Sequence, residues 1–211
     1  METKQYVIVD LEMCRVLRDQ RTEDYPLHNE IIEIGAVLVN ENLEIADSFK
    51  TYVAPQYGGL DDYIRKLTGI SDADLEGAPA LPEALEAFMA WVPQGAVFVS
   101  WSESDEYQLG EEAYYKYADT PELCDFLDTW EDCQQEFGEK MNSPKVYKLS
   151  EALIIADIAF DENIHDALVD AKNTAMLFIK MQKEPTLKLS PYYATEKDDD
   201  TTAFRPFANL F

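Results

Sequence analysis

The stretch Tyr6-Val7-Ile8-Val9-Asp10-Leu11-Glu12 decides how the rest of the chain is interpreted. Its first four residues form an apolar, β-branched run, which predicts a buried strand. Because side chains in a strand alternate between faces, Asp10 and Glu12 point to one side and Leu11 points into the core. A divalent cation such as Mg²⁺ or Mn²⁺ would relieve the repulsion between two neighbouring carboxylates. For Asp-x-Glu alone, two solvated acids at a strand end are the simpler explanation, so the other motifs must decide.

The composition limits the classes of protein to consider. The chain has 211 residues, of which 46% are hydrophobic, enough for one sizeable domain with a core. Its net charge of -25 argues against tight, sequence-independent binding to long nucleic acid and against an anionic membrane surface. The charge does not exclude a local site that binds phosphate through metal ions, because such ions are themselves large charges.

The cysteine and histidine content points away from structural zinc and disulfides. The chain has 3 cysteines and 2 histidines, and it has no C-x-x-C pair. Reduced thiols in an intracellular compartment are the simplest interpretation. The sequence has no signal-peptide pattern and no apolar run of membrane-spanning length. We therefore expect a soluble, cytoplasmic protein.

Hydrophobic periodicity predicts a three-stranded antiparallel meander followed by a mixture of helices and one further strand. The predicted strands cover 6–9, 31–39, 43–53 and 96–101, with a weaker strand signal at 126–130. The predicted helices cover 61–67, 82–92, 103–117, 131–141, 151–158 (capped by Ser150) and 166–183, and 13–30 is expected to be an irregular polar loop. This order predicts an α/β fold in which a mixed sheet is flanked by helices.

The chain is expected to divide after residue 183. Residues 1–183 form the predicted domain, and 184–211 form an appendage with an acidic run and terminal aromatic residues. Exposed phenylalanines are costly, so we expect these aromatics to dock on the domain or on a second copy of the chain, which would form a homodimer.

A second acidic motif lies where the strand at 96–101 passes into the next helix. Asp105 falls in the first turn of that helix. Ser102 and Asp105 also have the spacing of a capping box, so a purely structural role is a strong alternative for this acid.

A third motif is His165-Asp166-Ala167-Leu168-Val169-Asp170. Five residues along a helix separate two side chains by about 140°. His165 and Asp170 can therefore share a site only if the histidine lies in the loop before the helix. Asp166 makes a helix start at that point plausible.

Together, the motifs place four acids at the ends of secondary-structure elements: Asp10, Glu12, Asp105 and Asp170. Four carboxylates can hold two Mg²⁺ or Mn²⁺ ions, an arrangement used for cleavage of phosphodiesters. A nearby imidazole, which titrates near neutrality, can take the proton of the attacking water.

In these motifs the chain resembles the DEDDh-type 3′–5′ exonucleases, the DnaQ-like group with an RNase H-like fold. The matching segments are Asp10-Leu11-Glu12, the segment around Asp105, and the His165-to-Asp170 step that defines the "h" branch. The segments 29–36 and 66–71 resemble the family's second strand and a short segment beside its active site. Ser100-Trp101-Ser102 with Asp105 is closest to the subgroup that trims RNA 3′ ends.

The resemblance, which covers about residues 5 to 183, implies roles for individual residues. Asp10, Glu12, Asp105 and Asp170 would bind two metal ions. His165 would be the general base, and Glu12 counts as catalytic as well as metal-binding. Contacts to the terminal nucleotide would come from four residues, of which the last is equally well explained as a core residue: Met13, Leu67, Ile70 and Trp101.

The implied activity is 3′–5′ hydrolysis of single-stranded or short nucleic acid, with RNA slightly preferred, releasing nucleoside 5′-monophosphates. The chain departs from the family in its acidity and in Asp166, where many members have a basic or small residue. Weak, distributive trimming is therefore expected, helped by nearby basic residues: Arg15, Arg18, Arg21, Arg65, Lys66 and Lys172. The alternatives are a catalytically silent RNase H-like binding module and a nucleotide phosphohydrolase.

Overall fold

The computed structural model describes residues 4–161, 165–191 and 193, and it contains a five-stranded sheet with β1 (Tyr6–Arg15) in the middle. The strand order is β3-β2-β1-β4-β5. β1 pairs antiparallel with β2 and parallel with β4, which confirms the predicted mixed sheet. The other strands are β2 (Asn29–Val39), β3 (Ile45–Tyr52), β4 (Val97–Ser100) and β5 (Glu131–Asp132).

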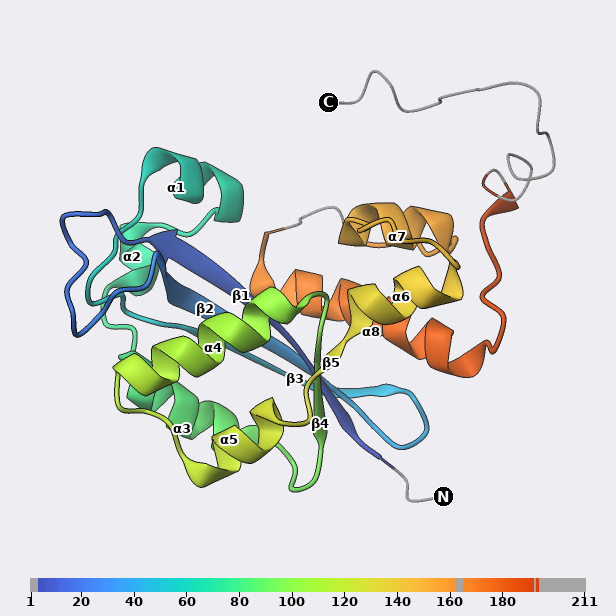
Figure 1. Cartoon of the computed structure of the whole chain (residues 1–211), viewed down its shortest axis with the longest axis horizontal. Helices are drawn as coiled ribbons and strands as arrows, with labels where there is room; N and C mark the ends of the chain where they lie inside the picture. The colour runs from blue at the N-terminus through green and yellow to red at the C-terminus, as the bar shows by residue number, and fades with distance from the viewer. Residues whose placement is uncertain (1–3, 162–164, 192, 194–211) are drawn as a thin grey trace.

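Helices cover both faces of this sheet (Figure 1). One face is covered by α3 (Leu81–Trp91), α4 (Glu103–Tyr115) and α5 (Pro121–Leu127). The other face is covered by α6 (Cys133–Lys140), α7 (Leu149–Ile155) and α8 (Ala167–Lys183). Two short helices, α1 (Asp62–Thr68) and α2 (Asp72–Leu75), follow β3 and lie beside the far end of β1.

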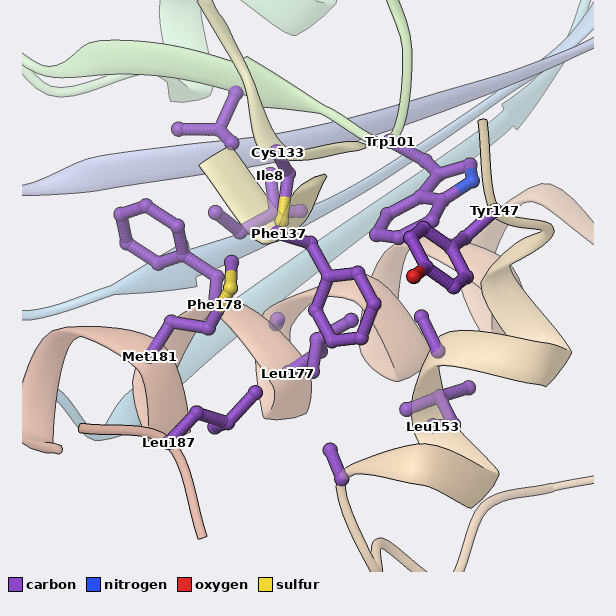
Figure 2. Packing of buried hydrophobic residues seen from close by; sticks show 14 of the residues in the cluster. Ile8, Trp101, Cys133, Phe137, Tyr147, Leu153, Leu177, Phe178, Met181 and Leu187 are labelled. Atoms are coloured by element: carbon purple, nitrogen blue, oxygen red, sulfur yellow. The ribbon is translucent and has the colours of Figure 1, made fainter. Parts of the chain in front are cut away.

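The alternation of side chains along β1 explains why it is the central strand. Val7, Val9 and Leu11 point into the core beneath α3, α4 and α5. Ile8 points the other way and packs with Phe178 of α8 in the second core, which Figure 2 shows. A strand that buries both faces needs a layer of helices on each side, and the chain supplies both layers.

Four predicted elements differ from the structure. The strand predicted at 126–130 is wrong, because Phe126 belongs to α5 and stacks on Phe98 with ring centroids 4.6 Å apart. Thr120 caps that helix by accepting the Leu123 N–H, with Pro121 in the first turn. An aromatic run suits a half-buried helix as well as a strand, which is why the composition misled the prediction.

The other differences concern boundaries. The helix predicted at 131–141 begins only at Cys133, because Glu131–Asp132 form the edge strand β5 beside β4. The loop predicted at 13–30 is shorter, because β1 continues to Arg15 and β2 already begins at Asn29. Ser150 does not cap α7, since the helix begins at Leu149 with Lys148 as its N-cap residue.

A buried ionic cluster at the start of β2 joins three parts of the chain: β2, the segment 56–58 and α4 with its C-cap residue. Glu30 accepts the backbone N–H groups of 56–58 at 2.5 to 2.9 Å. Glu112 of α4 accepts the N–H of Ile31 at 2.8 Å. The Lys116 ammonium lies 2.5 Å from Glu30 Oε1 and 2.8 Å from Glu112 Oε1, so one cation pairs with both buried carboxylates. We call these three residues the Lys116 cluster.

The first part of the appendage packs on the domain. Leu187 is buried in the same core as Met181, and the Ser190 N–H donates to the Ile155 carbonyl at 2.7 Å. The predicted docking of the terminal aromatics concerns 203–211, which lie outside the described residues. Within the described part of the chain, no helix is long and apolar enough to cross a membrane.

Candidate active site

Asp10 and Glu12 lie on β1 on the face covered by α8, opposite Leu11. Glu12 is buried, with 8% of its surface exposed. The pairing of β1 with β2 places Asp10 opposite Gly35 and Glu12 opposite Glu33, and the register shifts after Glu12. Such bulges change the direction of the side chains that follow, so this irregularity lies directly beside the two acids.

Asp105 reaches the same strand from the first turn of α4. The described strand β4 pairs with β1 only at residues 6–8, so β1 extends beyond its parallel neighbour. The Leu11 N–H on this edge donates to Asp105 Oδ1 at 3.1 Å, and Asp105 is buried. A buried backbone N–H group needs a hydrogen-bond acceptor, and this bond holds the Asp105 carboxylate against β1. The capping-box alternative is wrong, because the Ser102 side chain makes no capping hydrogen bond.

His165 and Asp170 come together at the start of α8, as their spacing required. Asp166 is the N-cap residue and accepts the N–H groups of Leu168 and Val169 at 3.1 Å. His165 therefore precedes the helix, and its own N–H donates to Asp170 Oδ2 at 2.9 Å. One potential ligand atom each from Glu12, His165 and Asp170 lies within 4.8 Å of the others.

Gly35 brings the start of α8 this close to the sheet. A Cβ atom on Gly35 would lie 2.2 Å from the carbonyl carbon of Ala167, well inside van der Waals contact. Gly35 also pairs with Asp10, so the closest contact between helix and sheet is beside the first acid. A glycine inside a strand often marks such a close backbone approach, and this signal was available in the sequence.

The carboxylates raise one another's pKa. Burial raises the pKa of Asp10 well above its usual range, and the charges of Asp105 and Asp170 add to the shift. Burial, with a contribution from Asp170, raises the pKa of Glu12 to about 8. Burial also raises the pKa of Asp105 to about 7, against the stabilising N–H of Leu11. The four predicted acids therefore share one electrostatic environment.

These residues suit a divalent cation. Asp170 Oδ1 is buried and has no hydrogen-bond partner among the described residues. Carboxylate oxygens are the donors that Mg²⁺ and Mn²⁺ prefer, and a bound cation would supply positive charge to this group of acids. The site is therefore a group of carboxylates that can hold metal beside one histidine; the sequence predicted metal binding for Asp10, Glu12, Asp105 and Asp170 and the role of general base for His165.

Sequence reasoning missed an ion pair network next to the site. The Lys50 ammonium of β3 lies 2.5 Å from Glu33 Oε1 and 2.6 Å from Asp166 Oδ2. Glu33 Oε2 accepts the Ala167 N–H at 3.2 Å. The available signal was Glu33 itself, an acid within a run of buried apolar residues, which needs a partner.

The four residues predicted to contact a nucleotide occupy different surroundings. Trp101 is buried and packs near Phe137 in the core shown in Figure 2. Ile70 is 3% exposed, in a small core with Cys14 and Ile64. Met13 and Leu67 keep part of their surface exposed.

The predicted basic residues at this end of the sheet have partners of their own. The Arg15 guanidinium lies 5.3 Å from the ring centroid of Tyr63, a residue that is 57% exposed. Arg65 pairs with Asp72 at 2.7 Å. An exposed arginine beside an exposed aromatic ring offers both charge and a stacking surface.

Comparison with known proteins places the chain in a family. The RNase T family model, described as an exonuclease, matches residues 7–178. DNA polymerase III subunit epsilon of Aquifex aeolicus is 31% identical over 198 residues, which cover 91% of this chain and 88% of that protein. The 3′-5′ exoribonuclease 1 of Rattus norvegicus is 27% identical, over 74% of this chain and 48% of the relative.

Other relatives are much longer than this chain. The PolC-type DNA polymerase III of Caldanaerobacter subterraneus is 34% identical over 155 residues, which cover 74% of this chain and 10% of that protein. This chain thus spans about a tenth of one such relative and about half of the rat protein.

Among solved structures, the nuclease domain of 3′hExo, described as a DEDDh family member bound to rAMP, has the same fold. Its TM-score is 0.74 at 24% identity, covering 90% of this chain and 97% of that domain. This confirms the predicted RNase H-like architecture. The chain belongs to the exonuclease family whose model matches residues 7–178, and it has the fold of a domain described as a DEDDh family member.

Proposed function

We propose that this protein is a metal-dependent 3′–5′ exonuclease that removes nucleoside 5′-monophosphates from single-stranded or short nucleic acid. The observation that carries the proposal is the meeting of Glu12, His165 and Asp170 within 4.8 Å, in a chain of this family. Asp105 and Asp10 complete the group: Asp105 accepts the Leu11 N–H, and its charge, after burial, raises the pKa of Asp10.

We propose two Mg²⁺ or Mn²⁺ ions, held by Asp10, Glu12, Asp105 and Asp170. Bound divalent ions would help to activate water and to stabilise the charge that develops on the leaving oxygen. The support is the unpartnered Asp170 Oδ1 and the raised pKa of each carboxylate, since both show negative charge that the described residues do not neutralise.

His165 is the proposed general base. Its imidazole would accept the proton of the attacking water while the water oxygen bonds to phosphorus and the P–O3′ bond breaks. The products are a nucleoside 5′-monophosphate and a shortened strand that ends in a 3′-hydroxyl. The hydrogen bond from the His165 N–H to Asp170 holds the histidine beside the carboxylates.

The substrate is proposed to be RNA by a small margin. The segment Ser100-Trp101-Ser102 resembles that of the RNA-trimming subgroup, and one relative is named an exoribonuclease. Other relatives are named DNA polymerase III subunits, so both kinds of strand must be tested. Met13 and Leu67 are partly exposed and are therefore the better proposed contacts for the terminal base. Ile70 and Trp101 are buried and would mainly support the residues that contact the base.

The test is a cleavage assay with RNA and DNA oligonucleotides labelled at the 5′ end, in Mg²⁺, Mn²⁺ or EDTA. With substrate in excess, Asp105→Asn and His165→Ala should abolish the ladder that shortens from the 3′ end, while single-turnover conditions with excess enzyme should still reveal slow residual cleavage by His165→Ala. Glu103→Gln is the matched control, because Glu103 is an exposed acid in the same first turn as Asp105. Cleavage that survives EDTA or both site variants, or no cleavage of either strand, would overturn the proposal. The silent binding module and the nucleotide phosphohydrolase would then be tested with binding and mononucleotide assays.

A further inference from the structure

We propose that Lys50 is a positioning residue for His165, acting through Glu33 and Asp166. We call Lys50, Glu33 and Asp166 the Lys50 clamp. The inference rests on the proposed function, because it concerns the histidine of the same site. It adds a contribution from β3, a strand that carries none of the proposed metal ligands or the base.

The backbone of His165 needs to be held in place. Its φ angle is 70°, in the left-handed region that side-chain-bearing residues rarely adopt. Such a conformation costs free energy and persists only where the surrounding structure fixes it. The orientation of the imidazole is therefore set by whatever holds the turn before α8.

The clamp and Asp170 hold three successive residues of this turn. The N–H of His165 donates to Asp170. The carboxylate of the next residue, Asp166, caps the helix with one oxygen and binds Lys50 with the other. The N–H of Ala167 donates to Glu33, which binds the other side of the same ammonium. Lys50 thus ties the turn to the sheet at two points.

Lys50 also neutralises a charge that would disturb the site. Glu33 is 1% exposed and pairs with Glu12 across β1 and β2. Without Lys50, the Glu33 carboxylate would be a buried charge beside Glu12, and removing one partner of a buried pair is strongly unfavourable. The turn that depends on Glu33 would be expected to rearrange, and His165 would move with it.

The clamp differs from an ordinary surface ion pair. Lys145 and Glu151 also form a close pair, but their side chains are 53% and 38% exposed, against 28% and 1% for Lys50 and Glu33. Exposed pairs contribute little, because solvent screens them. Lys145→Met is therefore the matched control for Lys50→Met.

The test is a double-mutant cycle. Lys50→Met, Lys50→Arg and Lys145→Met are made in the wild-type chain and in His165→Ala, and single-turnover cleavage is measured with excess enzyme. We expect Lys50→Met to lower the cleavage rate constant about 10- to 100-fold, as misplacement of a reacting group does, with KM changed less than about threefold. Lys50→Arg should recover part of the loss, and Lys145→Met should match the wild type.

The cycle isolates the positioning role. In the His165→Ala background the effect of Lys50→Met should shrink to less than about threefold, because there is no imidazole left to position. Amide hydrogen exchange gives a readout besides activity: Lys50→Met should speed exchange at His165 and Ala167, whose N–H groups the turn protects. If Lys50→Met does not fold, Asp166→Asn replaces it, since asparagine can still cap α8 but cannot form the ion pair.

Each result decides the proposal. A wild-type rate in Lys50→Met, or a loss as large in the His165→Ala background as in the wild type, would overturn it, as would unchanged exchange at His165 and Ala167. Absence of cleavage by the wild-type chain would overturn the proposed function instead. The exchange measurement would then still show whether Lys50 holds the turn.

Discussion

Two groups of buried or partly buried carboxylates lie on β1, β2 and the helices that pack against them, and they differ in their partners. In the Lys116 cluster, Glu30 and Glu112 have a lysine and several backbone N–H groups as partners. In the candidate active site, burial raises the pKa of Asp10 and the charges of Asp105, Asp170 and Glu12 raise it further, while Asp170 keeps a buried oxygen without a hydrogen bond among the described residues. The first group has a cation of the chain's own, Lys116, between its carboxylates, whereas the metal ions proposed for the second would come from outside the chain. The difference separates a structural from a functional use of the same residue type.

The largest effect is expected from Asp10→Asn. It removes one proposed metal ligand and one repelling charge, so the cleavage rate should fall by at least about a thousandfold, or about 4 kcal/mol of transition-state stabilisation. The metal-free protein should be as stable as the wild type or more stable, because the repulsion is relieved. Single-turnover cleavage and thermal unfolding in EDTA measure both. A cleavage rate within tenfold of the wild type would show that the group of acids around Asp10 is not the active site.

In contrast to Asp10→Asn, Lys116→Met should lower the stability of the protein and leave its cleavage rate nearly unchanged. It leaves Glu30 and Glu112 buried without their cation, so the free energy of unfolding should fall by about 3–5 kcal/mol. Cleavage per folded molecule should stay close to that of the wild type. Urea denaturation measures the loss, and Lys140→Met, which affects the surface pair with Glu136 at 3.8 Å, is the control with little expected effect. If the two variants were equally stable, the Lys116 cluster would not be a structural ion pair network.

Metal binding should stabilise the folded protein through the candidate active site and not through the Lys116 cluster. At a concentration near 100 times its dissociation constant, Mg²⁺ or Mn²⁺ should add about 2.7 kcal/mol to the free energy of unfolding. The gain should be absent in Asp10→Asn and preserved in Lys50→Arg. It should also grow between pH 6 and 8.5, because protons compete for Glu12, whose pKa is about 8. Thermal unfolding with and without metal tests this, and an equal gain in Asp10→Asn would place the ion elsewhere.

The smallest expected effect is the pH dependence of the metal-free protein. Because burial raises the pKa of Glu12 to about 8, the folded state binds more protons than the unfolded state between about pH 4.3 and 8. The free energy of unfolding should therefore fall as pH rises through this window, and stay level once Glu12 is ionised in both states. Glu12→Gln should reduce the slope, with the rest coming from other acids. An identical slope in wild type and Glu12→Gln would contradict the shift.

The sequence was sufficient for the parts of the site that local patterns determine. Alternation along β1 predicted that Asp10 and Glu12 share a face, and helix geometry predicted that His165 precedes α8. The meander and α8 followed from strong periodicity. These patterns could not predict which residue contacts each acid, because hydrophobic periodicity describes one helix or strand at a time.

The features that the sequence did not reveal depend on contacts between distant parts of the chain. The Asp105 hydrogen bond joins residues 94 positions apart, and the Glu33 to Ala167 bond joins residues 134 apart. In the sequence, Asp105 therefore has the spacing of a capping-box residue, whereas in the folded chain its carboxylate binds the backbone of β1. Lys50 looked like any surface lysine, because only the folded sheet places it beside Asp166.

The short link between β4 and α4 has a consequence for changes in chain length. Only Trp101 and Ser102 separate the strand from the helix that carries Asp105, and the Trp101 carbonyl is bound by the Gln134 N–H. An inserted or deleted residue here would rotate α4 and move Asp105 away from Leu11, so length variation in this link is incompatible with the site. The exposed turn at 41–42, between β2 and β3, carries no such constraint. A reporter sequence or affinity tag should therefore be inserted there.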